Sequence, residues 1–166
     1  MGCEDFLVRL SSDSTPQAAA HVLVGIPGIC PDALVPALPT EVHFRYEDSE
    51  HIIEIEVAGA GPCTTLSLRF ALCHPSSIDD VFAALVVDLV VALGADIIIA
   101  EDIDPDEPGL GLSFSSAQVA DLRKALAQCI PKKRNLWREE FGSTLARASC
   151  RDALERFVIG ASARPI

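Results

Sequence analysis

The feature that most constrains the fold is residues 65–103, whose pattern indicates a strand, a helix and a second strand. In residues 66–70 apolar and polar side chains alternate, which is typical of a strand with one buried face. In residues 97–100 apolar side chains follow one another without a break, which predicts a strand covered on both faces. A helix between two such strands indicates a crossover connection within one sheet.

The helix between these strands has sequence signals at both ends. We expect Ser77 to be its N-cap, because Asp80 follows three residues later as in a capping box. Gly94 supplies the left-handed residue that commonly ends a helix. Asp88 lies among valines and leucines, and helical periodicity places it at the exposed edge. If Asp88 is buried instead, it needs a partner such as Arg69.

The rest of the chain predicts further strands and two more helices. The expected strands are 5–11, 41–47, 51–59 and 110–115, and the expected helices are 16–24 and 117–129, the second capped by Ser116 and ended by Pro131. A basic amphipathic segment follows, broken near Gly142. We therefore expect one α+β domain over residues 1–166, with a basic helical C-terminal segment from about 132. Its mostly antiparallel sheet would have four to six strands, helices packed on one face and one strand–helix–strand crossover.

The charge is strongly acidic and unevenly distributed. The formal net charge of the chain is -11. Residues 1–131 carry 20 acidic and 5 basic residues, a net of -15, whereas residues 132–166 carry 4 acidic and 8 basic residues, a net of +4. Such a balance argues against nucleic acid as a partner and suits docking of a basic protein. Two interpretations of the asymmetry stay open: a basic C-terminal helix against an acidic body, or two docking surfaces of opposite sign.

The six cysteines and the N-terminus favour a cytoplasmic protein. The cysteines are scattered without a CxxC pair, and the N-terminus lacks the basic and apolar regions of a signal peptide. Residues 81–100 are long enough to cross a membrane, but Asp88 and Asp96 would each cost about 2.5–3.5 kcal/mol near a bilayer centre. We therefore expect no membrane partner.

The densest polar group is an acidic turn that follows the strand predicted around residues 97–102. It consists of Glu101, Asp102, Asp104, Asp106 and Glu107. We expect this turn to bind the partner, because an acidic loop raises the association rate with a basic surface. The alternatives are a solvated loop and a loosely held divalent cation. An EF-hand fails, because Glu107 stands where that loop needs glycine.

Signatures of catalysis, metal binding and RNA binding are weak elsewhere. The four histidines lack metal-ligand spacing, so no metal or other cofactor is expected. His51 and Cys73 on neighbouring strands could form a nucleophile pair, but we favour the interpretation that neither residue is catalytic. The basic run 132–134 with Trp137 is interpreted as a solvated flank of a helix, although an RNA contact is the alternative. We therefore expect a non-enzymatic protein. The alternative is a small enzyme or ligand-binding domain that uses the acidic end of strand 97–102.

Three segments resemble, in architecture, the immunity proteins of bacterial polymorphic toxin systems. These are LSLRF at 66–70, the helix at 78–93 and IIIAED at 97–102. The resemblance implies an acidic cytoplasmic protein that binds a cognate toxin and occludes its active site, as an antitoxin or toxin inhibitor does. The partner would be an enzyme with a basic cleft, often a nuclease. A homodimer is left open.

Overall fold

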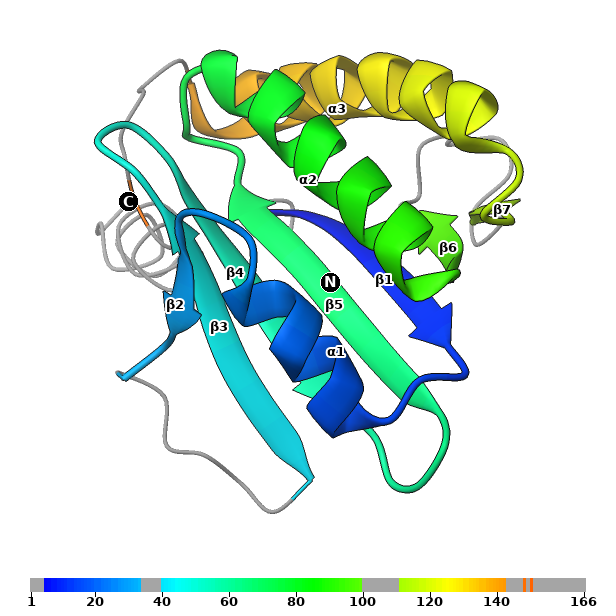
Figure 1. Cartoon of the computed structure of the whole chain (residues 1–166). Helices are drawn as coiled ribbons and strands as arrows, with labels where there is room; N and C mark the ends of the chain where they lie inside the picture. Colours follow the sequence, from blue (N-terminus) through cyan, green and yellow to red (C-terminus); the bar gives the residue numbers. More distant parts are fainter. Residues whose placement is uncertain (1–4, 34–39, 100–110, 143–147, 149, 151–166) are drawn as a thin grey trace.

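The computed structural model describes residues 5–33, 40–99, 111–142, 148 and 150, and these form an α+β fold (Figure 1). The elements in chain order are β1 (Asp5–Ser12), α1 (Pro16–Val24), β2 (Ile29–Pro31), β3 (Glu41–Glu47), β4 (Ile52–Ala58), β5 (Thr64–Ala71), α2 (Ser77–Leu93), β6 (Asp96–Ile99), β7 (Leu112–Phe114) and α3 (Val119–Phe141). The predicted fold class is confirmed.

The seven described strands form one antiparallel sheet in the order β2-β3-β4-β5-β1-β6-β7. This is one strand more than the expected four to six. The additional strand is β2, a short edge strand in the proline-rich connection. Because β1 pairs antiparallel with both β5 and β6, those two strands run parallel with β1 between them. The predicted crossover is therefore confirmed, and α2 makes it.

The three helices lie on one face of the sheet, as predicted (Figure 1). The core fills the space between the helices and the sheet. At its centre the ring of Phe70 lies 4.9 Å from that of Phe82 on α2 and 5.9 Å from that of Phe6 on β1. Alternate residues of β1, β4 and β5 are fully or almost fully buried on this face. The opposite face carries most of the polar side chains of these strands.

The first helix begins and ends where its sequence predicts. The hydroxyl of Thr15 accepts a hydrogen bond from the backbone N–H of Ala18 at 3.2 Å, and Pro16 occupies the first position. Gly25 is its C-cap.

The capping box expected at the start of α2 is wrong. Ser76 is the N-cap, no side chain caps the helix, and Ser77 is the first helical residue. The hydroxyl of Ser77 contacts His51 instead. Gly94 ends the helix with a φ of 57°, as predicted.

The expectation that strand 97–100 is covered on both faces is also wrong. Ile97 and Ile99 are fully buried against the helices, whereas Ile98 points to the other face and is 45% exposed. Every pairing of β6 is antiparallel, and an antiparallel sheet can leave one face open to solvent. An apolar run by itself does not distinguish these two situations.

Pro131 does not end the helix that begins before it. The α3 helix begins after Gln118, rather than after Ser116, and continues through Pro131 to Gly142. An interior proline removes one helical hydrogen bond and crowds the preceding turn. Burial of Ile130 before the proline, and of Arg134 and Trp137 after it, offsets this cost. The predicted break near Gly142 is confirmed, and most of the basic segment beyond it lies outside the described residues.

Candidate functional site

The acidic turn expected to bind the partner lies outside the described residues. This applies to Glu101, Asp102, Asp104, Asp106 and Glu107, so neither partner binding nor cation binding by this turn is tested. Asp88 lies at the exposed edge of α2, as predicted, and Arg69 pairs with Glu54 instead of Asp88.

A chain of polar side chains joins the β3–β4 hairpin to the start of α2. Nδ1 of His51 lies 3.0 Å from Oδ2 of Asp48, and Nε2 of His51 lies 3.0 Å from Oγ of Ser77. The two ring nitrogens of His51 are therefore both engaged. The nucleophile pair of His51 with Cys73 is wrong, because the histidine faces Ser77.

Hydrogen bonds within the β3–β4 hairpin hold the side chain of Asp48 in place. Its Oδ1 accepts hydrogen bonds from the backbone N–H groups of Glu50 and His51 at 2.8 and 2.7 Å, and its Oδ2 accepts one from the Tyr46 hydroxyl at 3.0 Å. Partial burial works against ionisation, but the hydrogen bonds from His51, the backbone and Tyr46 prevail and lower the pKa of Asp48 far below its usual range. Asp48 is therefore a carboxylate at neutral pH.

The carboxylate fixes the tautomer of His51. An ionised carboxylate only accepts hydrogen bonds, so Nδ1 of His51 carries a proton. In the neutral imidazole Nε2 is then unprotonated, and it accepts the hydrogen bond of the Ser77 hydroxyl. His51 is 7% exposed, whereas Ser77 lies at the surface. The arrangement is a buried base with an oriented ring beside an accessible hydroxyl.

A groove of about 510 Å³ lies between α2 and α3, and Ser76 but not Ser77 is among its lining residues. Its lining residues are Ser76, Asp79, Asp80, Ala83, Ala84, Arg123, Leu126, Ala127, Ile130 and Pro131. Alanine, leucine and isoleucine side chains make much of its wall apolar, and the charged residues make the rest polar.

Arg134 of α3 anchors the loop that precedes α2. The guanidinium is 2% exposed, donates to the carbonyl of Leu72 at 2.9 Å and to that of His74, and pairs with Asp79. Burial raises the pKa of Asp79, and the charge of Arg134 acts in the opposite direction. The interpretation of 132–134 and Trp137 as a solvated flank is wrong for Arg134 and Trp137, which are core residues, whereas Lys132 is exposed. Their burial also argues against an RNA contact through these two side chains.

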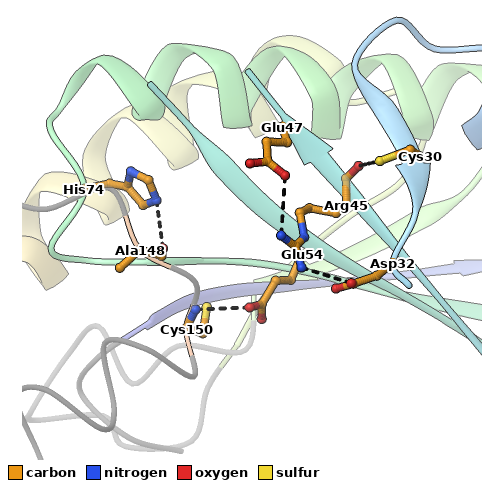
Figure 2. Close-up of polar contacts among 8 residues, drawn as sticks. All are labelled: Cys30, Asp32, Arg45, Glu47, Glu54, His74, Ala148 and Cys150. Atoms are coloured by element: carbon orange, nitrogen blue, oxygen red, sulfur yellow. Dashed lines mark hydrogen bonds and ion pairs between the residues drawn. The ribbon is translucent and has the colours of Figure 1, made fainter. Parts of the chain in front are cut away.

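Ion pairs link strands on the sheet face opposite the helices. Arg45 of β3 contacts Asp32 at 2.9 Å and Glu47 at 3.4 Å, as Figure 2 shows. On the neighbouring strands Arg69 pairs with Glu54 at 2.8 Å. The arginines of β3 and β5 are therefore both engaged within the sheet.

The C-terminal residues that the structure describes contact this same face and the loop after β5. The backbone N–H of Cys150 donates to Oε1 of Glu54 at 3.1 Å, and Nε2 of His74 lies 2.9 Å from the carbonyl oxygen of Ala148 (Figure 2). Burial raises the pKa of the Cys150 thiol well above its usual value, and Glu54 adds to this effect. The thiol is therefore protonated at neutral pH and is a poor nucleophile.

The opposite end of α2 is acidic. Asp96 begins β6 and lies opposite Ser11, so Asp13, two residues further along the chain, lies at the same end of the sheet. The hydroxyl of Ser12 donates to the carbonyl of Leu93, so the carboxyl end of α2 lies at the same end of the sheet as Asp96. We call Asp13, Asp88 and Asp96 the acidic end. All three are exposed and form no ion pair within the described part of the chain.

The described residues hold neither a metal cluster nor a membrane span. Over these ranges no three histidine, cysteine, aspartate or glutamate side chains come together as metal ligands. Each described helix is too short or too polar to cross a bilayer.

Comparisons of the chain with protein-family models, with curated proteins and with solved structures found no match. Function is therefore argued from the residues themselves.

Sequence reasoning missed the grouping of Asp48, His51 and Ser77. The interval of three between Asp48 and His51 is a local signal, because an aspartate in a hairpin turn binds the backbone just after it. Ser77 lies 26 residues beyond His51, and only the packing of α2 brings it there. No pattern in one sequence reveals that contact.

Proposed function

We propose that this protein binds a basic protein partner through acidic surface, in the manner of a cytoplasmic immunity protein that masks a toxin. The observation that supports the proposal is the charge of the body of the fold. Residues 5–33 and 40–99 contain 13 acidic and 3 basic residues, a net of -10. Two of the three basic residues, Arg45 and Arg69, are already in ion pairs.

The acidic end is the surface that best fits such a partner. The carboxyl end of a helix carries a partial negative charge, and the last turn of α2 contains no basic residue. Asp96 adds a full negative charge beside it, Asp13 lies at the same end of the sheet, and Asp88 lies about one and a half turns before the end of α2. The basic side chain of β1, Arg9, lies opposite Ile98 and forms no ion pair with another described residue. A cationic partner would relieve this uncompensated charge.

The contribution expected from this surface is mainly to association. Complementary charge steers diffusional encounter and raises association rates by about 10–10³-fold, an effect that salt screens. Residues 101–107 lie outside the described residues and carry five more acidic side chains, and separate variants distinguish the two groups.

The test uses as its probe a basic protein recovered with this chain by pull-down from its native host, and measures association by surface plasmon resonance at several NaCl concentrations. Neutralising Asp13, Asp88 and Asp96 together is expected to slow association and flatten its salt dependence. A second variant reverses the charges of Asp102, Asp104 and Asp106. The matched control, Glu139→Gln with Glu140→Gln on α3, should leave both quantities unchanged. Unchanged association in both acidic variants would refute the proposal.

A further inference from the structure

We propose that Asp48, His51 and Ser77 form a second site, in which Ser77 is a nucleophile towards carboxylic esters. This activity goes beyond partner binding and departs from the expectation of a protein without catalytic function. The site lies at the amino end of α2, a helix of 17 residues, and the acidic end lies at the other. At 1.5 Å per residue the two are separated by about 25 Å.

The geometry supplies the parts that an acyl-transfer site needs. The nucleophile and base lie 3.0 Å apart, and the base and the carboxylate that orients it lie 3.0 Å apart. These distances lie within the range of about 2.6–3.2 Å expected for such a set. Tyr46 and the hairpin backbone fix Asp48. Asp48 is therefore a positioning residue, and His51 and Ser77 are the catalytic residues.

The start of α2 provides a place for the negative charge that develops on the substrate. Ser77 is the first residue of the helix, and no side chain caps that end. The backbone N–H groups of Ile78 and Asp79 already donate to the carbonyl oxygens of Pro75 and Ser76, so the helix contributes the positive end of its dipole here. The oxyanion of an attacked carbonyl would form near this end. Ser76, the chain neighbour of Ser77, is a lining residue of the partly apolar groove between α2 and α3, which suits a short acyl chain.

The reaction proceeds in two balanced steps. The Oγ of Ser77 bonds to the acyl carbon of the ester while its proton passes to Nε2 of His51. The carbon–oxygen bond to the alcohol then breaks, and the departing alcohol takes that proton. Water attacks the acyl-Ser77 ester in the second step, with His51 again accepting and returning the proton. The products are the carboxylic acid and free Ser77.

The test is covalent labelling of the full chain by a fluorophosphonate probe, located by peptide mass spectrometry, together with hydrolysis of p-nitrophenyl butyrate. We expect Ser77 to be labelled and Ser76, its exposed neighbour, to be unlabelled. Ser77→Ala should abolish labelling and hydrolysis, and Ser113→Ala, at an exposed position on β7, should change neither. His51→Gln should lower both by about 10²–10⁴-fold, the usual contribution of a general base.

Asp48→Asn separates catalysis from a purely structural role. The asparagine amide donates to Nδ1 of His51 and selects the tautomer with a proton on Nε2, which then cannot accept the proton of Ser77. Labelling should therefore fall in this variant even where circular dichroism shows it folded. Equal labelling of Ser76 and Ser77, or labelling that survives His51→Gln in the folded protein, would overturn the proposal. The three residues would then have only a structural role, holding the β3–β4 hairpin against α2. Binding of the basic partner should be unchanged in Ser77→Ala, so failure of this proposal is distinguishable from failure of the first.

Discussion

The two ends of α2 differ in how their polar groups are satisfied. At the amino end Ser77 contacts His51, His51 contacts Asp48, and Asp79 pairs with Arg134. At the carboxyl end Asp88 and Asp96 have no cation within the described part of the chain, although the helix itself ends in partial negative charge. Internal contacts hold the polar side chains at the amino end in place. At the carboxyl end, the aspartates carry negative charge that an external partner can neutralise. This difference yields predictions of graded size.

The largest effect is expected from Arg134→Ala. The substitution removes a buried guanidinium and leaves Asp79 and the carbonyls of Leu72 and His74 without it. Removing one member of a buried ion pair typically costs about 3–5 kcal/mol. Urea denaturation should show this loss. Arg123→Ala, at an exposed position on the same helix, should change the free energy of unfolding by less than about 0.5 kcal/mol. Similar stabilities for the two variants would mean that the amino end is not anchored by Arg134.

Asp48→Asn should produce an intermediate, pH-dependent effect. The folded state lowers the pKa of Asp48 from its ordinary value of 3.8, so its carboxylate stabilises the fold above that pH. This contribution is lost as the pH falls from 3.8 towards the lower folded pKa. The variant should therefore be less stable than the wild type at pH 7, by roughly 1–2 kcal/mol for weakened hydrogen bonds. Thermal denaturation from pH 7 to pH 2 should show the difference narrowing below pH 4. A constant difference would contradict this linkage.

The smallest effect, of opposite sign, is expected at the carboxyl end. Asp96→Asn removes a negative charge beside the negative end of α2, and should stabilise the protein by about 0.3–1 kcal/mol at low salt. Asp121→Asn is the matched control, because Asp121 lies in the first turn of α3 and should stabilise that helix. The substitution Asp121→Asn should therefore lower the free energy of unfolding by a similar amount. If Asp96→Asn destabilises the fold, its carboxylate is compensated and the acidic end is not available as proposed.

Much of the fold could be predicted from local patterns. Alternation in residues 66–70 predicted β5, Pro16 after Ser14 or Thr15 predicted the start of α1, and Gly94 predicted the end of α2. Predictions failed where tertiary packing outweighs a local rule. Pro131 lies inside α3 because the residues on both sides of it are buried, and Ser77 binds His51 rather than capping its own helix.

The candidate sites were less predictable than the fold. The importance of the acidic residues is visible in composition, but the pairing of Arg45 and Arg69 within the sheet depends on strand register. The placement of Asp13 at the same end of the sheet as Asp96 depends on β1 pairing with β6, two strands that are more than eighty residues apart in the sequence. Contacts of that range are not encoded in the pattern of any one segment.

The most direct test of the central claim maps where the basic partner binds. Amide hydrogen exchange, measured on the free chain and on its complex with a basic protein recovered by pull-down from the native host, should show new protection at residues 88–98 and 11–13. Residues 46–51 and 76–80, at the amino end of α2, should exchange as before. Protection confined to the amino end, with the acidic end unchanged, would contradict the account.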